Sequence, residues 1–302
     1  MAGEVGVSGG FLIPAGQAQE ILTARGEAAF VRPRARVVPM SSRVVPFPVL
    51  DYSQGAAGVN AFTGGIRVYW TEENTNITES QPTFKNVDLH ARGLAGYVEI
   101  PNGLIQDSAI SLEAFLSGPN GFGGALAAEE DYQALNGNGA GKFMGIIGSP
   151  GELTVTRSTS SDFKFVDAVT MMSKMLMTSA PVWVINQSVM PKLLQFADAA
   201  SFNIFVLNAS MGLSGTLLGI PIDWTGKNPA LGTKGDVCLV DWGFYLIGDR
   251  QQITVDVDRS YKFQADQTAL RIVERVDGQP WLATTITLMD GSTTVSPYVV
   301  LN

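Results

Sequence analysis

The sequence has little of the residue types that build catalytic centres and strongly charged surfaces. Its 302 residues include one histidine and one cysteine, and charged residues make up 16%, against about a quarter in an average soluble protein. One His and one Cys cannot supply the ligand set of a zinc site, and a lone cysteine excludes an intrachain disulfide. Cys238 stands in the apolar run DVCLVDWG and is expected to be a small buried thiol.

The shortage of charge predicts that much of the surface faces other protein, because solvated faces are normally built from Lys, Arg, Asp and Glu. The alternative is a monomer with a largely neutral surface. The net charge of −8 argues against a protein that grips nucleic acid through basic phosphate contacts. It does not exclude one that encloses nucleic acid without holding it.

Long hydrophobic runs are also missing. No apolar run approaches the roughly 18 residues of a membrane span. The first residues, MAGEVGVSGGFLIPAGQAQEIL, lack a basic start followed by a hydrophobic stretch, so we expect no signal peptide. We therefore expect a soluble chain that is made inside the cell.

The stretch LNGNGAGKFMGII (135–147) is the nearest approach to a nucleotide-binding loop. A phosphate loop needs Gly, four residues, Gly-Lys and then Ser or Thr. Here Asn136 stands at the first Gly position, and Phe143 replaces the hydroxyl that would hold magnesium. Gly137, Gly139 and Gly141 also miss the dinucleotide spacing. The stretch is therefore no phosphate loop, and the other interpretation is a joint between two structural elements, in which these glycines act as a hinge.

Paired carboxylates occur at Glu72-Glu73 and Glu129-Glu130. Neighbouring helical positions such as 129 and 130 do not face each other, and the first pair falls in a polar loop. His90 lies on the outer face of an alternating segment and is expected to be solvated. The sequence therefore predicts no catalytic residue, no metal site and no cofactor, and we expect no enzyme.

The alternation of polar and apolar residues, together with the positions of proline and glycine, predicts the elements of the N-terminal half. Residues 36–50 are β-branched but interrupted by prolines, which indicates edge strands or strand ends. Residues 66–71 and 87–92 alternate in polarity and flank a polar stretch, which predicts a long β-hairpin with these two arms. Residues 103–136 predict a short helix, a break at Pro119 and Gly121, and a longer helix that leads into the glycine joint.

In the C-terminal half, the clearest helix is predicted at 162–177, with Ser160 or Ser161 as N-cap. Its apolar face would carry Phe165, Val166, Val169, Met172, Met175 and Leu176. Residues 181–186 predict a buried strand, 187–198 a helix with Pro191 in its first turn, and the remainder mostly strands. The class is α+β with mixed sheets.

The order of these elements and several stretches resemble the major capsid proteins of tailed bacteriophages, the Hong Kong 97-type fold family. GGFLIPAGQAQEIL is similar to the arm signature of that family. YWTEENTNITESQPTFKNVDL is similar to its extended loop, where Trp or Pro followed by Glu precedes a polar stretch and a Phe. LIQDSAISLEAFL and EEDYQALNGNGAGKFMGII resemble the start of the spine helix and its Gly-rich exit. LLGIPIDWT, CLVDWGFYLIGDRQQITV and ALRIVERVDGQP resemble the closing segments.

The resemblance implies an α+β, Hong Kong 97-type capsid fold with an N-terminal arm, an extended β-hairpin loop, a peripheral domain with a long spine helix, and an axial domain. The arm would be residues 1–29 and the loop 50–83. The peripheral domain would combine 30–49, 84–142 and 250–278, and the axial domain 143–249 and 279–302. The expected inter-subunit contacts in arm and loop are Phe11, Leu12, Ile13, Trp70, Glu72, Glu73 and Phe84.

The implied function is structural. The chain would self-assemble into pentamers and hexamers of an icosahedral shell that encloses double-stranded DNA without binding it specifically. Scaffolding, portal and decoration proteins are the implied partners, with no membrane involved. The protein would reside in the virion capsid after assembly in the host cytoplasm.

Two departures from the family pattern concern processing. Some members join subunits through a loop lysine and a neighbour's asparagine. Here Ile77 and Asp266 stand near those positions, so we expect no such cross-link. Many members also carry a helical scaffolding segment before the arm. Because the arm here follows Met1 almost at once, we expect a separate scaffold, or a processed or recloned chain.

Three alternatives remain open at the level of sequence. An encapsulin-type nanocompartment shell shares the fold, although the long Gly-rich loop and the GGFLIP arm favour the viral interpretation. A hydrolase would use Glu72, Glu73, Glu129 or Glu130. A tail or decoration protein would be structural without forming a closed shell.

Overall fold

The structure, a computed structural model, describes residues 27–107, 118, 121–176, 180–195 and 215–302. The predicted arm contacts Phe11, Leu12 and Ile13 lie outside these residues. The chain divides into two units, one that includes 95–125 and 254–272, and a larger one of 27–94, 126–253 and 273–302. Three strands, β4 (Arg92–Pro101), β10 (Tyr245–Lys262) and β11 (Gln267–Pro280), contribute residues to both units.

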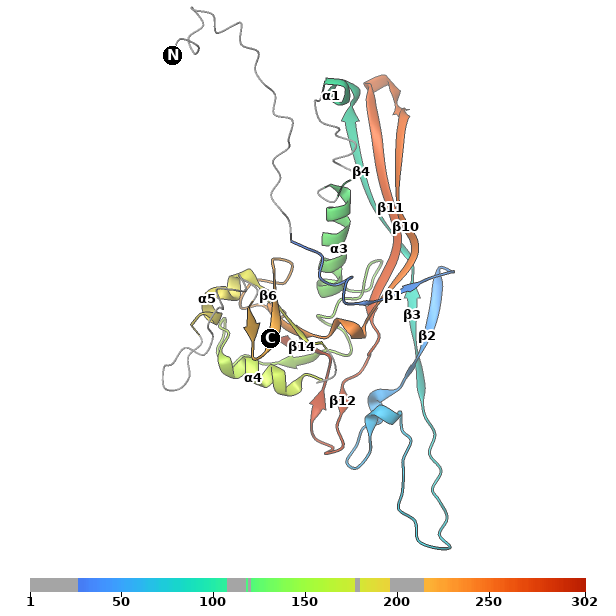
Figure 1. The fold of residues 1–302 in the computed structure, drawn as a ribbon, viewed down its shortest axis with the longest axis vertical. Coiled ribbons are helices and arrows are strands. Elements are labelled where there is room, and N and C mark those ends of the chain that lie inside the picture. Colours follow the sequence, from blue (N-terminus) through green and yellow to red (C-terminus); the bar gives the residue numbers. More distant parts are fainter. Residues whose placement is uncertain (1–26, 108–117, 119–120, 177–179, 196–214) are drawn as a thin grey trace, which may run out of the picture. The chain divides into compact units, whose positions relative to one another are not determined.

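The larger unit contains a six-stranded sheet in the order β5-β14-β9-β6-β8-β7 (Figure 1). The strands are β5 (Leu153–Val155), β6 (Val182–Asn186), β7 (Thr216–Leu217), β8 (Ile220–Thr225), β9 (Val237–Val240) and β14 (Tyr298–Leu301). β6 is antiparallel to β9 and parallel to β8, so the sheet is mixed, as predicted. The buried strand predicted at 181–186 is β6, which confirms that prediction.

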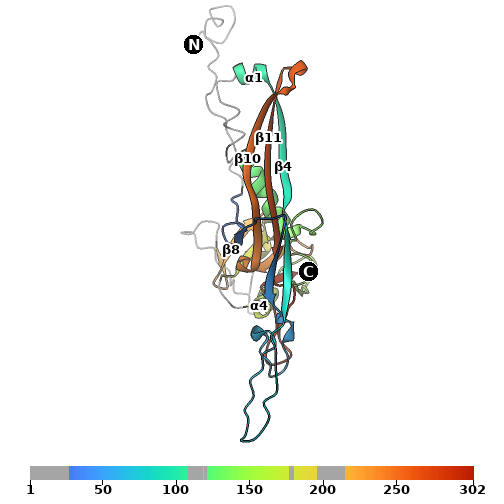
Figure 2. The same cartoon turned by 90° about the vertical axis from the view of Figure 1, so that its right-hand side faces the viewer.

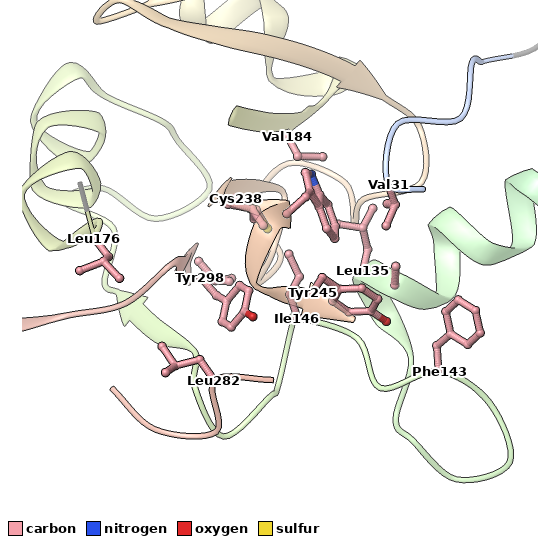
Figure 3. Close-up of a cluster of buried hydrophobic side chains, with 14 of the residues drawn as sticks. Val31, Leu135, Phe143, Ile146, Leu176, Val184, Cys238, Tyr245, Leu282 and Tyr298 are labelled. Carbon is pink, nitrogen blue, oxygen red and sulfur yellow. The ribbon is translucent and has the colours of Figure 1, made fainter. Parts of the chain in front are cut away.

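Alternate residues of the central strands enter two different hydrophobic clusters, because side chains alternate across a sheet. Trp183 and Ile185 of β6 belong to one cluster, which also contains Met171, while Val184 belongs to the other. Figure 3 shows this second cluster, in which Val184 and Cys238 from the sheet lie with Leu135, Ile146 and Tyr245. Cys238 is fully buried, as predicted, and burial raises the pKa of its thiol. Apolar packing on both faces explains why β6, β9 and β14 read as continuous hydrophobic runs.

The helix predicted at 162–177 is α4 (Phe165–Lys174), and its buried face agrees with the prediction only in part. Phe165 and Met172 pack against the core, and Met175 and Leu176 are buried just beyond the end of the helix. Val166 is 63% exposed and Val169 44%, whereas Asp167, Ala168 and Met171 are buried. Asp167 tolerates burial because its carboxylate accepts the backbone N–H groups of Ser158 (2.8 Å) and Lys164 (3.1 Å). The helix therefore begins after Lys164, and the predicted Ser160 and Ser161 caps are wrong.

The other helices follow the predicted order. The short helix is α1 (Asn102–Asp107) and the longer one is α3 (Phe122–Asn136). Pro191 lies in the first turn of α5 (Met190–Leu193), where a missing N–H costs nothing. The 3₁₀ turns are η2 (Tyr52–Gln54), η3 (Ala61–Thr63), η4 (Gln187–Val189), η6 (Trp242–Phe244) and η7 (Phe263–Ala265). Among the described residues, no helix combines the length and apolarity that a membrane crossing requires.

The predicted hairpin exists, and its second strand overlaps the predicted arm 87–92, but its first strand is not the predicted one. β2 (Val44–Leu50) pairs antiparallel with β3 (Phe84–His90), from Val44 opposite His90 to Leu50 opposite Phe84. Residues 66–71, the predicted first arm, form no regular strand. The prolines of β2 do not prevent this pairing because a two-stranded ladder leaves one edge of each strand free. His90 is exposed, as predicted.

A four-stranded sheet has the order β1-β10-β11-β4, with β1 (Arg36–Pro39) at one edge. β1 runs parallel to β10, from Arg36 opposite Leu246 to Pro39 opposite Asp249. Figure 2 shows β4, β10 and β11 running side by side, in agreement with that order. A small antiparallel pair, β12 (Ile286–Thr287) and β13 (Thr294–Val295), completes the sheets among the described residues. The edge strands predicted within 36–50 are confirmed as β1 and β2.

Candidate functional site: assembly surfaces

The chain between β2 and β3, residues 51–83, starts from a well-anchored base. Asp51 is buried, accepts the N–H of Ser53 at 3.0 Å and pairs with Lys85 at 2.9 Å. Burial works to raise the pKa of Asp51, but hydrogen bonds from Ser53 and Lys85 outweigh it and lower the pKa to about 2. Gly58 donates its N–H to Met289 O at 2.8 Å, beside β12. The first residues of this connection are therefore held by contacts to β3 and to the chain beside β12 before the connection extends away from the sheets.

Beyond Gly64 the chain extends outward and then returns, with few hydrogen bonds between its outgoing and returning segments. We call residues 66–83 the excursion. Thr83 N donates to Gly64 O at 3.0 Å, and Arg67 N donates to Ser80 Oγ at 3.1 Å. Gly64 adopts a positive φ of 64°, and a Cβ there would lie 2.5 Å from Leu50 Cδ1. A glycine is thus required where the two segments leave the base.

The excursion exposes large apolar side chains within its own subunit. Trp70 is fully exposed, Val68 is 93% exposed, Ile77 77%, and Phe84 at the start of β3 66%. Each such side chain gains about 1.5–3 kcal/mol when a surface covers it. Several exposed large apolar side chains in one short segment are typical of a contact site. The predicted contacts Trp70 and Phe84 are therefore available for a neighbouring surface.

The predicted contact residues Glu72 and Glu73 lie near the middle of the excursion, where the chain turns back. Thr75 N donates to Glu72 O at 3.3 Å, which closes a turn in which Asn74 has a φ of 64°. Both glutamates are exposed. They stand in a turn that few other contacts support, so they have none of the rigid surroundings that a catalytic carboxylate pair needs.

The other carboxylate pair diverges, as helix geometry predicts. Glu129 is exposed and accepts the Gln133 amide at 2.6 Å, whereas Glu130 is buried and bound to Arg32. The hydrolase alternative gains no support from this arrangement. Among the described residues, no group of His, Cys, Asp and Glu side chains is arranged to hold a metal ion.

The glycine joint follows α3 directly and is closely packed. A Cβ on Gly137 would lie 2.2 Å from Phe143 O and 2.5 Å from Gln133 O. Gly139 and Gly141 have positive φ values of 73° and 83°. The returning chain is bonded to the helix end, with Gly145 N to Gly137 O at 2.8 Å. All three glycines are thus required by local geometry, while their action as a hinge stays a prediction.

The residues at the predicted cross-link positions differ in their surroundings. Ile77 is exposed on the excursion and has no reactive group. Asp266 follows η7 with a φ of 50°, and its carboxylate accepts the Asn102 amide at 2.7 Å. The described structure therefore offers no lysine–asparagine chemistry at these two positions.

Sequence reasoning missed a charge cluster in the larger unit, which we call the Arg32 cluster: Arg32, Glu130, Asp249 and Glu274. The guanidinium lies 2.6 Å from Glu130, 2.7 Å from Asp249 and 3.0 Å from Glu274. The pKa of Arg32 is raised, above all by its hydrogen bond to Glu130. The sequence did contain one indication of this cluster. Side chains two residues apart on a strand lie on the same face, so Glu274 shares a face with the buried Ile272 and Val276 and could have been predicted to be buried.

Comparison with known proteins identifies the class. The phage capsid family model matches residues 9–291, which is most of the chain, so the chain belongs to the phage capsid family. A curated relative is the major capsid protein of Klebsiella oxytoca phage phiKO2, with 22% identity over 300 residues. That match covers 89% of this chain but 65% of the relative, so the chain spans somewhat less than two thirds of the relative's length.

Solved structures show the same fold. The capsid of a native GTA particle matches with a TM-score of 0.77 and 18% identity, covering 98% of this chain and 97% of that one. The capsid of an empty GTA particle gives 0.75 and 19%, covering 98% and 96%. A chain of Mycobacterium phage Bobi gives 0.69 and 15%, covering 97% and 96%. The predicted fold class, α+β of the Hong Kong 97 type, is confirmed, and the family assignment points to a structural role in the virion capsid.

Proposed function

We propose that this chain is the major capsid protein of a tailed bacteriophage and that it assembles into the pentamers and hexamers of an icosahedral shell. The excursion carries the proposal: Val68, Trp70 and Ile77 are exposed within their own subunit and gain stability when an adjacent copy covers them. Obligate assemblies of this kind bury on the order of 2,000 Å² or more at an interface. The low charged fraction of 16% suits such extensive protein contact.

In this proposal each part of the chain has an assembly role. Residues 1–29 act as an arm that is fastened to its own body at Glu27, and 50–83 act as an extended loop; the parts of both that leave the body lie on neighbouring subunits. Residues 30–49, 84–142 and 250–278 form the peripheral domain. Residues 143–249 and 279–302 form the axial domain at the centre of each pentamer or hexamer. The closely packed joint at Gly137, Gly139 and Gly141 links α3 of the first domain to the second.

The proposed work of the protein is containment, without enzymatic activity or a cofactor. A net charge of −8 gives the shell no general attraction for an acidic genome, so double-stranded DNA can move during filling. Assembly would take place in the host cytoplasm with a scaffold and a portal, and decoration proteins could then bind the outside. Nuclease-protected double-stranded DNA in particles from an infected host is the expected content, and a protein cargo in its place would favour an encapsulin-type shell.

The test is assembly of the purified full chain, followed by electron microscopy and sedimentation velocity. Wild type should form closed shells. Trp70→Ala should shift most of the protein to free subunits or capsomers, and Trp70→Phe, which keeps an aromatic contact, should restore shells. Circular dichroism of the three proteins separates lost assembly from lost folding. If Trp70→Ala forms shells as well as wild type does, the excursion does not provide the contacts that hold the shell together. Wild type that stays monomeric under all assembly conditions would overturn the proposed function.

A further inference from the structure

A small cavity lies in the larger unit beside α3 and the glycine joint. It has a volume of about 70 Å³, and its lining residues come from β4, α3, the joint and β11, all within that unit. Leu94, Phe143 and Val276 are apolar members of the lining, and Figure 3 shows Phe143 next to the end of α3. Arg92 of β4 and Gln133 of α3 are polar members. The cavity therefore combines apolar walls with hydrogen-bonding groups.

Two buried atoms of the polar residues have no hydrogen-bond partner in the part of the chain that the structure describes: Nε of Arg92 and Oε1 of Gln133. The orientation of the Gln133 amide is set by its neighbour, because Nε2 donates to the Glu129 carboxylate at 2.6 Å and a carboxylate can only accept. The remaining Gln133 atom is therefore an acceptor, and Arg92 Nε–H is a donor. Because buried polar groups are nearly always paired, the cavity suits a ligand that both accepts and donates.

The glycine joint brings bare backbone next to the Arg92 guanidinium. Gly141 also lines the cavity, and a Cβ at that position would lie 3.9 Å from Arg92 Nη1. Gly141 has a positive φ of 83°, a conformation that favours glycine. No side chain at position 141 therefore stands between the guanidinium and a ligand.

The charges around the cavity favour a neutral ligand. Its lining contains two cations, Arg92 and Lys142, and two carboxylates, Glu129 and Glu130. These charges balance, and Glu130 also belongs to the Arg32 cluster, in which three carboxylates surround one guanidinium. An anion would face these carboxylates and the amide oxygen, whereas a cation would face the guanidinium. Either ion would lose its hydration without gaining a full set of partners, which is costly.

We propose that this cavity is a binding site for a neutral carboxamide, the group that Asn and Gln side chains carry. The carbonyl oxygen of the ligand accepts from Arg92 Nε, and its NH₂ group donates to Gln133 Oε1. The volume of about 70 Å³ is far below the roughly 300–1,000 Å³ of a pocket for a drug-sized molecule, so the site takes a group of a few atoms. The apolar part of the lining accommodates the carbon next to the amide.

The experiment titrates three probes of nearly the same size and shape into the unassembled full-length subunit: acetamide, acetone and acetate. Proton–nitrogen NMR spectra follow the Arg92 Nε–H signal and the Gln133 side-chain amide signals. Acetamide should shift both in a saturable manner, with a Kd on the order of 10 mM for so small a ligand. Acetone has no donor for Gln133 Oε1 and should bind about fivefold more weakly or worse. Acetate, which brings a charge, should bind more weakly than acetamide as well.

Two variants of α3 show whether Gln133 recognises the ligand. Gln133→Met keeps the length of the side chain without the amide. It should bind acetamide about fivefold more weakly or worse and should lose the preference for acetamide over acetone. Tyr132→Phe is the matched control, because Tyr132 is exposed on the same helix and does not line the cavity. It should titrate as wild type does.

Any of four results would overturn the proposal. Acetate that binds more tightly than acetamide would make this an anion site, and acetone that binds equally well would show that the cavity is merely filled. No saturable shift with acetamide would leave the cavity to solvent, and a direct hydrogen bond between Arg92 and Gln133 would leave nothing to recognise a ligand. The ranking of the probes in wild type decides the matter if Gln133→Met does not fold.

The source of the carboxamide is then determined by electron cryomicroscopy of assembled particles. An Asn or Gln side chain of a second copy in the cavity assigns the carboxamide to a neighbouring chain, and a cavity that no chain enters assigns it to a free small molecule. Because the titrations use the unassembled subunit, their outcome is independent of whether the chain forms shells.

Discussion

Gly137→Ala tests whether the exit from α3 is as tightly determined as the structure indicates. The new Cβ would stand 2.2 Å from Phe143 O and 2.5 Å from Gln133 O, closer than any tolerated contact. The chain can relieve this by shifting these two carbonyls, which accept hydrogen bonds from Gly137 N at 2.8 Å and Gly139 N at 3.0 Å. Gly137 is buried, so water cannot replace those partners.

The cost can be worked out from these two bonds. Each buried backbone group left without a partner costs about 1–3 kcal/mol. The reduced freedom of alanine in the unfolded chain returns about 0.4–1 kcal/mol. We therefore expect Gly137→Ala to lower the free energy of unfolding by about 2–5 kcal/mol. Urea unfolding of the unassembled subunit, followed by circular dichroism, measures this directly.

Gly93→Ala is the matched control, because a Cβ at Gly93 meets nothing within 4 Å. It should be neutral or slightly stabilising. If Gly137→Ala unfolds at the same urea concentration as Gly93→Ala, the joint is not the close-packed element described here, and the steric reasoning fails.

Two further predictions concern a buried ion pair and the shell. Arg157→Met should destabilise the subunit by about 3–5 kcal/mol. The substitution leaves Asp236 without its ion-pair partner, and the side chain of Asp236 is fully buried 2.5 Å from the guanidinium. The exposed pair Arg34–Asp223 is the comparison, and Arg34→Met should cost under about 1 kcal/mol; equal thermal shifts for the two variants would contradict this. Assembled particles should run as single subunits on denaturing gels, because Ile77 has no amine to join a neighbour, and covalent multimers would show that the expectation is wrong.

The candidate site was predictable to very different degrees. Trp70 and Phe84 could be named as contacts from the resemblance of their stretch to the extended loop of the family, and both prove exposed. The glycine joint could be placed from its spacing. The Arg32 cluster could not, because its members lie 98, 217 and 242 residues from Arg32 and no local pattern connects them.

What the sequence determined by itself were features that local periodicity or composition specifies. Continuous apolar runs predicted the buried strand β6, and alternation placed strands in the C-terminal half. Only the tertiary structure decided which segments meet: β3 pairs with β2 and not with 66–71, and α4 buries Met171 while Val166 faces outward. Strand alternation and helical period are set by neighbouring residues along the chain. The choice of partner and of buried face is set by surfaces that come together only on folding.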